Sequence, residues 1–102
     1  MIITEEVKRI VQGTAFLSLV TLNADGSPHL IIAGKGEVLG DTVVFGIYKM
    51  EKTQANLVRN KNAWVGAAVI AEGNPKGVRL IGTAEAQDGK LVFRAIKTES
   101  LI

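Results

Sequence analysis

The residue types best suited to bind a ligand lie together in residues 49–56, with the sequence KMEKTQAN. This segment follows an apolar run typical of a strand, residues 43–48, and begins a stretch typical of a helix. At such a boundary the first helical N–H groups are free and the helix dipole is positive, while Lys52 adds an ammonium and Thr53 a hydroxyl. These are the donors that a phosphate monoester requires. The alternative is a surface helix with Thr53 as an ordinary N-cap.

Two other groups of residues were considered as ligand sites. Gly34, Lys35 and Gly36 resemble a phosphate loop, but their spacing matches neither the dinucleotide nor the P-loop pattern, and no helix follows. Glycines within strands more often mark a bulge or a bend. His29 follows a turn and has no Ser, Cys or acid arranged with it as a triad, so we expect an edge residue near solvent.

The composition excludes several classes of protein. With 102 residues, 47% of them hydrophobic, the chain suits one folded domain, residues 1–102, and excludes disorder. It contains no cysteine and one histidine, so disulfides, thiolate sites and metal centres have few ligands or none. The net charge of +2 allows acidic ligands, but the basic residues are scattered and form no nucleic-acid stripe. No apolar run approaches the roughly 20 residues of a membrane span, and we expect a cytoplasmic protein.

Turn residues and apolar runs divide the chain into short elements. Thr4 is a predicted N-cap, followed by Glu5 and Glu6 in the first turn of a helix that Gly13 ends. A second short helix is predicted for residues 53–59. The predicted strands are residues 14–22, 29–38, 42–48, 63–70, 78–87 and 90–97. This pattern predicts a mainly β protein with a closed six-stranded antiparallel sheet.

Several predicted strands lack a clean polar face. Residues 14–22, 29–38 and 63–70 are apolar on both faces, so both sides of the sheet must be covered. A small barrel whose outer surface packs on a second copy of the chain meets this requirement. The apolar faces of residues 14–22 and 63–70 therefore predict a homodimer.

The order of these segments resembles the split-barrel flavin-binding family of the pyridoxamine 5'-phosphate oxidase kind, especially its small dimeric FMN-binding proteins. The resemblance includes LVTLNADGSPHLI at residues 19–31 and GDTVVFGIYKMEKTQANLVRNKNAWVGAAV at residues 40–69, and covers most of the chain. Its most specific part is the Lys-Thr-x-Ala-Asn motif at residues 52–56, with Leu57 and Asn60 behind it. The resemblance implies a six-stranded antiparallel split β-barrel with two short helices, which holds FMN at a homodimer interface.

The resemblance also implies which residues bind FMN. In that family the strand-to-helix corner holds the phosphate, which carries this role to Lys52 and Thr53, with Gln54 next to them in the motif. The residues implied along the flavin ring and ribityl chain are Ile47, Tyr48, Lys49 and Met50, with Ile31, Ile32, Ala33 and Lys35 on the other side. Ile32 and Ala33 replace polar residues of related members, so backbone contacts would have to suffice there.

The chain ends in two apolar residues, Leu101 and Ile102, which need cover. Because the terminus lies near the partner's flavin in the resembling family, the resemblance implies that they shield one edge of the ring. The alternative is that both residues pack on their own barrel.

A flavin brings its own redox chemistry, so the protein need only bind it, exclude water and tune its electronics. A chain without a triad, a metal cluster or paired carboxylates is consistent with this role, and we expect electron transfer or a small flavin reductase or oxidase with an unknown redox partner. One alternative is a nucleic-acid-binding barrel, which would need more exposed aromatic residues than this chain offers. Another is a split barrel that binds a deazaflavin, haem or no cofactor.

Overall fold

A single antiparallel sheet of seven strands, flanked by two helices, makes up the computed structural model, which describes residues 1–101. The elements in chain order are α1 (Glu5–Gly13), β1 (Ser18–Leu22), β2 (Pro28–Ile32), β3 (Glu37–Leu39), β4 (Thr42–Gly46), α2 (Glu51–Arg59), β5 (Asn62–Ala71), β6 (Asn74–Gln87) and β7 (Lys90–Ser100). Within the described chain, neither helix is long and apolar enough to cross a membrane. The mainly β fold class with two short helices is confirmed.

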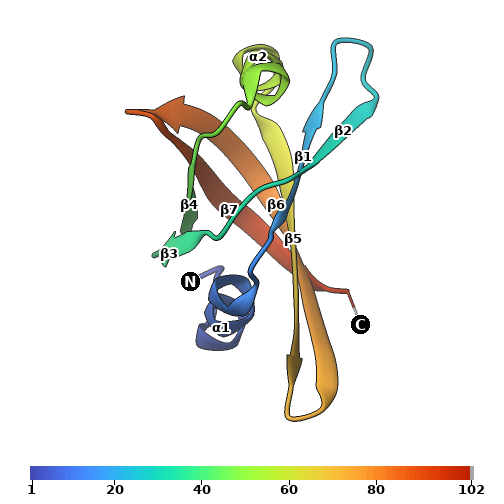
Figure 1. The fold of residues 1–102 in the computed structure, drawn as a ribbon, viewed down its shortest axis with the longest axis vertical. Coiled ribbons are helices and arrows are strands. Elements are labelled where there is room, and N and C mark those ends of the chain that lie inside the picture. Colours follow the sequence, from blue (N-terminus) through green and yellow to red (C-terminus); the bar gives the residue numbers. More distant parts are fainter. Residues whose placement is uncertain (102) are drawn as a thin grey trace.

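The strand order is β2-β1-β5-β6-β7-β4-β3, with every neighbouring pair antiparallel. The long strands β5, β6 and β7 form the back of the curved sheet, and α1 and α2 lie at opposite ends of it (Figure 1). Strands β2 and β3 are the two edge strands, so the sheet is not hydrogen-bonded all the way round. The barrel is therefore split along one side, next to the free edge of β2.

The core consists of apolar side chains on the inner face of the sheet and on the two helices. The largest side chains with almost no exposed surface are Phe45, Phe93, Leu17, Leu19, Leu80 and Leu91. Helix α1 contributes Ile10 and Val11, and α2 contributes Leu57. As predicted, Thr4 caps α1, since the backbone N–H of Val7 donates to Thr4 Oγ1 at 3.2 Å.

The number of strands differs from the prediction because the expected strand at residues 29–38 is interrupted. Strand β2 ends at Ile32 and β3 begins at Glu37, which makes seven strands instead of six. At Gly36 an added Cβ would lie 2.7 Å from Val43 Cγ1 and 2.8 Å from Leu17 Cδ1. The chain therefore passes so close to the core here that only glycine fits, and this crossing leaves β2 as a separate edge strand.

The hairpin between β5 and β6 is longer than predicted. Glu72 and Gly73 have φ values of 52° and 81° and form a tight two-residue turn, so Pro75 and Gly77 belong to β6 rather than to the turn. Strand β7 likewise continues to Ser100, which pairs with Val78. The predicted start of β6 was wrong because proline and glycine within a strand resemble turn residues. The predicted end of β7 at residue 97 was three residues too early.

Candidate functional site

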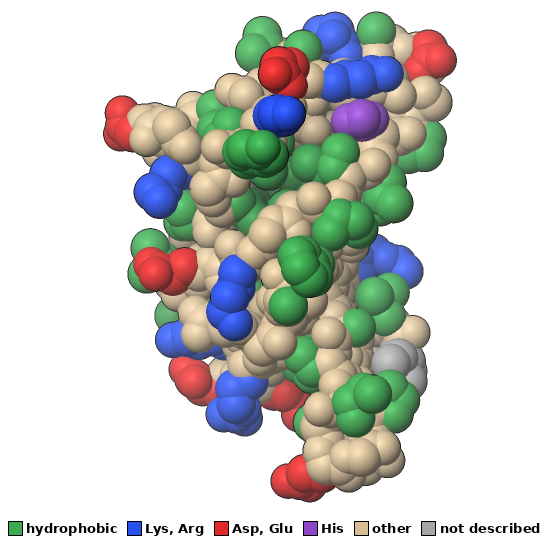
Figure 2. Space-filling view, viewed as in Figure 1, with side chains coloured by type: hydrophobic (Ala, Val, Ile, Leu, Met, Phe, Trp, Pro, Cys, Tyr) green, Lys and Arg blue, Asp and Glu red, His purple; other side chains and the backbone are tan. Residues whose placement is uncertain are grey.

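A pocket of about 310 Å³ lies where the barrel is split, between the edge strand β2 and the start of α2. Its lining consists of His29, Ile31, Ile32, Tyr48, Lys49, Met50, Glu51, Lys52 and Thr53. Two segments far apart in the sequence thus form its two walls. Figure 2 shows the one histidine of the chain, in purple, on this face between basic and hydrophobic side chains.

The chain turns sharply into α2 at Lys49, whose φ of 58° lies in the left-handed region. Met50 is the N-cap residue and makes no side-chain capping hydrogen bond. The first helical bond runs from the N–H of Gln54 to the carbonyl of Met50, at 2.8 Å. The N–H groups of Lys52 and Thr53 precede it and have no acceptor within the helix, so this helix end can donate to an anion.

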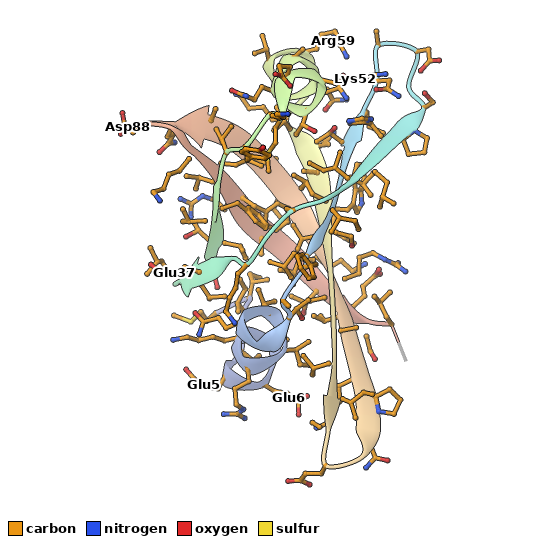
Figure 3. All side chains as sticks on the ribbon, in the orientation of Figure 1. Glu5, Glu6, Glu37, Lys52, Arg59 and Asp88 are labelled. Atoms are coloured by element: carbon orange, nitrogen blue, oxygen red, sulfur yellow. The ribbon has the colours of Figure 1, made fainter. Side chains whose placement is uncertain are left out.

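Thr53 lies in the first turn of α2 and is 1% exposed, although it lines the pocket. Its hydroxyl makes no hydrogen bond within residues 1–101, and since no fully buried side-chain nitrogen or oxygen there lacks a partner, this oxygen keeps some exposed surface and remains available to a ligand. Because α2 begins at Glu51, the alternative that Thr53 is the N-cap is wrong. Lys52 extends from α2 toward the β1–β2 hairpin (Figure 3). An ammonium, a free hydroxyl and unpaired N–H groups thus meet at one corner of the pocket.

Asn56 fixes α2 on the sheet, one turn after Thr53. It is 2% exposed, and its Nδ2 donates to Thr21 Oγ1 on β1 and to Asn23 Oδ1 in the β1–β2 turn, both at 3.1 Å. Its Oδ1 accepts from Arg59 at 2.7 Å. The sequence motif contained Asn56 but gave it no role. These bonds attach α2 to β1 and to the β1–β2 turn, and β1 pairs with β2, the other wall of the pocket, so Asn56 helps to fix the distance between the two walls.

The turn that joins β1 to β2 carries an acidic residue close to the basic corner. Hydrogen bonds from the Ser27 hydroxyl, and then from the Ser27 N–H at 2.9 Å, lower the pKa of Asp25. The charge of Lys52 contributes to the same lowering as the smallest cause. The Asp25 carboxylate is therefore ionised and within electrostatic reach of Lys52.

Seven of the residues expected at the cofactor line this pocket: Ile31, Ile32, Tyr48, Lys49, Met50, Lys52 and Thr53. Ala33 is 3% exposed and belongs to the core, so only its backbone could touch a ligand. Lys35 lines a separate depression beside Lys90, Ile47 packs against the core, and Gln54 lies in α2 outside the pocket lining.

The two C-terminal residues expected near the flavin do not line the pocket of their own chain. Leu101 is 44% exposed and lies on the outer side of the sheet, in a hollow with Ser18 and Trp64. Its N–H donates to the carbonyl of Gly77 at 3.0 Å. Ile102 lies outside the described residues.

Sequence reasoning missed two pocket residues, His29 and Glu51. His29 was expected at an edge near solvent, and it does lie on the edge strand, but it is half-buried. The period-2 pattern of β2 places it on the same face as Ile31, which could have indicated the pocket. Among residues 1–101 no group of three His, Cys, Asp or Glu side chains could hold a metal ion.

The outer face of β2, β1 and β5 is apolar and partly uncovered. Val20 is paired with both Leu30 and Trp64, which extends one row of apolar side chains across three strands. Leu30 is 61% exposed and Ile32 is 63% exposed, both on the edge strand. This row lies next to the pocket, because Ile32 belongs to both.

Comparison with known proteins identifies the family. The family profile described as Pyridoxamine 5'-phosphate oxidase matches residues 3–99. The chain therefore belongs to the pyridoxamine 5'-phosphate oxidase family, which confirms the resemblance seen in the sequence. No curated protein sequence matches the chain significantly.

Solved structures share this fold at low sequence identity. An FMN-binding protein from Syntrophomonas wolfei subsp. wolfei superimposes with a TM-score of 0.80 at 17% identity, covering 96% of this chain and 85% of its own. A haem-binding protein from Mycobacterium smegmatis gives 0.79 at 20% identity, covering 95% of this chain and 52% of its own. An FAD-binding protein from the same organism gives 0.74 at 18% identity, covering 91% and 87%. At these identities the likeness establishes the fold alone.

Proposed function

We propose that the pocket binds FMN, with its phosphate at the N-terminus of α2. The observation that carries this proposal is the uncapped helix end, where the hydroxyl of the largely buried Thr53 makes no hydrogen bond within residues 1–101 and lies beside the exposed side chain of Lys52. A phosphate dianion would accept hydrogen bonds from the N–H groups, the hydroxyl and the ammonium together. Membership of the family and the FMN-binding protein among the similar structures support the choice of a flavin.

The flavin ring would lie along the free edge of β2. This strand pairs with β1 only, so the backbone groups of its other edge are free to hydrogen-bond a heterocycle. Ile31 and Met50 offer apolar contacts to the ring, and Tyr48, which is 78% exposed, could cover it. Backbone contacts would replace the polar side chains that related members carry at Ile32 and Ala33.

The proposed protein is a homodimer that buries the apolar outer face of β2, β1 and β5. In such a dimer Leu101, on that side of the sheet, would approach the partner's pocket and shield one edge of its flavin. One chain has a mass of 10.9 kDa, and sedimentation at micromolar concentration should give twice this mass. A stable monomer that still holds flavin would contradict a site shared between two subunits.

FMN would supply the redox chemistry, as electron transfer or a small reductase or oxidase in the cytoplasm, with a redox partner still to be identified. The chain's own residues would bind the phosphate, orient the ring through the edge of β2 and exclude water from one of its faces. No described residue is assigned to a proton transfer.

The test begins with the absorption spectrum of the purified protein. Flavin bands, and release of FMN on denaturation, would support the proposal, whereas a haem Soret band or an empty protein that ignores added FMN would contradict it. Titration with FMN should then show a loss of roughly 2–4 kcal/mol for the Lys52→Ala/Thr53→Ala double variant, which loses one charge-assisted and one neutral hydrogen bond.

Two controls make this titration specific. Riboflavin has no phosphate, so its affinity should change much less in the double variant. The matched control Lys76→Ala removes a lysine that pairs with Glu6 at the α1 end of the molecule, at 3.6 Å, and should leave FMN affinity unchanged. Equal FMN affinity of the double variant and the natural chain would refute the phosphate assignment.

A further inference from the structure

His29 lies on the pocket wall that faces the proposed phosphate site. Strand β2 alternates between exposed and half-buried residues, which places His29 and Ile31 on the inner face and Leu30 on the outer one. In the register of the β1–β2 hairpin His29 is opposite Thr21. Figure 2 shows the imidazole beside a basic side chain at the end of the molecule where Figure 3 places Lys52.

The position of His29 relative to α2 is fixed by hydrogen bonds rather than by a mobile loop. Thr21, which is 1% exposed, accepts the hydrogen bond from Asn56 of α2 at 3.1 Å. Asn56 follows Thr53 by one helical turn, so its amide attaches the start of α2 to β1, the strand with which the strand of His29 is paired. The imidazole and the hydroxyl of Thr53 therefore line one pocket from opposite walls.

The other ionisable groups that face this pocket keep their charge near neutral pH. Lys49 and Lys52 contribute cations, Glu51 contributes a carboxylate, and Tyr48 contributes a phenol. Outside the lining, Asp25 interacts with Lys52 and has a lowered pKa, first through its hydrogen bonds with Ser27. Among these groups, histidine is the residue type whose charge changes between about pH 5 and pH 8.

We propose that His29 is a third donor to the phosphate and makes the affinity for FMN depend on pH; this rests on the proposed FMN site. A neutral imidazole donates one ordinary hydrogen bond, whereas an imidazolium donates a charge-assisted one that is roughly twice as strong. Acidification thus adds a positive charge opposite the helix end, without any change in the fold.

The test compares FMN dissociation constants of His29→Gln and the natural chain between about pH 5.5 and pH 8.5. The phosphate of free FMN loses a proton near about pH 6, and this titration is common to both proteins and cancels in the ratio, whereas any coupling between the bound phosphate and His29 belongs to the effect that is measured. The dissociation constant of His29→Gln divided by that of the natural chain should rise about tenfold from the alkaline to the acid end of this range. With riboflavin the ratio should stay constant, and Lys76→Gln, a loss of positive charge far from the pocket, should give a constant ratio with FMN.

A second measurement does not depend on the variant. The chain has one histidine, so NMR gives one imidazole whose titration can be followed directly. Since the bound phosphate favours the imidazolium, the titration midpoint should move up by about one pH unit when FMN is bound, which corresponds to the tenfold ratio. A constant ratio together with an unmoved midpoint would overturn the role of His29 and leave the FMN site standing.

The same experiment separates this proposal from the proposed function. If the natural chain binds no FMN, the proposed function fails, and the midpoint is measured with inorganic phosphate as the probe instead. An upward shift with inorganic phosphate would support an anion site that includes His29, and no shift would overturn it.

Discussion

The two helices have the same length, but a side chain caps the N-terminus of α1 and none caps that of α2. Each has nine residues and a glutamate in its first turn. In α1 the hydroxyl of Thr4 accepts a hydrogen bond from the first turn, so a side chain of the protein itself satisfies the helix end. In α2 the N-cap Met50 offers no such acceptor, and the threonine of that helix, Thr53, has a hydroxyl without a partner.

This difference separates a helix end that the protein itself satisfies from the helix end that we propose as a binding site. Free N–H groups at a helix start must find an acceptor in the protein, in water or in a ligand. At α1 the protein provides it, and the surface around this helix carries an ion pair between Glu6 and Lys76. At α2 the donors remain open beside a pocket with two lysines and a histidine, which is why we propose a ligand anion as their acceptor.

The largest effect is expected from the side-chain amides that attach the helices to the sheet. Asn56→Ala removes three hydrogen bonds from a buried site and should lower the free energy of unfolding by roughly 3 kcal/mol. Gln12→Ala removes one bond, from Val38 N to Gln12 Oε1 at 3.0 Å, and should cost about 1 kcal/mol. Urea denaturation measures both. Only Asn56→Ala should also lower the affinity for FMN. An equal loss of FMN affinity in both variants would contradict the assignment of the binding site to α2 rather than to α1.

A crossed pair of threonine variants gives the next largest effect. Thr4→Val keeps the shape but removes the cap of α1, so it should cost about 1 kcal/mol of stability and leave FMN binding unchanged. Thr53→Val removes a hydroxyl without a protein partner, so stability should not fall, while FMN affinity should drop by about 1 kcal/mol. Thermal melting and FMN titration of both variants suffice. The same pattern in the two variants would show that both threonines have the same role.

The sequence predicted the helices, most strands and the strand-to-helix corner that lines the pocket, because their signals are local. Thr4 with two glutamates, and the motif at Lys52 and Thr53, can be recognised without knowledge of distant contacts. The break between β2 and β3 was missed because the tight fit of Gly36 against Leu17 and Val43 exists only after the barrel has formed. The family was confirmed by the family profile, whereas the roles of the individual site residues remain predictions.

The positions of His29 and Lys35 could not be predicted either, because they too depend on contacts between residues far apart in the sequence. His29 acquires a position opposite Thr53 only through the bonds of Asn56 to the β1–β2 hairpin, which join residues 35 and 33 positions apart. Lys35 was expected at the cofactor because the resemblance placed it on the predicted strand of residues 29–38, but the close crossing at Gly36 carries it to another depression. Neither effect has a signature in the local sequence.

The smallest effects are expected from two aspartates, one at each end of the molecule. At the α1 end a hydrogen bond from the N–H of Ile3, at 3.0 Å, lowers the pKa of Asp41, and at the α2 end the bonds from Ser27 lower the pKa of Asp25. A carboxyl whose pKa is lower in the folded state adds stability above its unfolded pKa, and this contribution disappears as the pH falls through the folded value. Asparagine keeps an acceptor oxygen without the charge.

Asp41→Asn and Asp25→Asn should therefore melt slightly below the natural chain at neutral pH, and the differences should vanish as the pH falls below the normal range of aspartate pKa values. Melting curves recorded across this range test the sign, and a difference in melting temperature that grows in acid would contradict it.

FMN affinity distinguishes the aspartate at the α2 end of the molecule from the one at the α1 end. Asp25 interacts with Lys52, so its replacement should strengthen FMN binding by at most about twofold, because Lys52 then faces only the phosphate. Asp41 lies at the other helix and its replacement should leave FMN affinity unchanged; a change there would mean that the two helix ends are coupled.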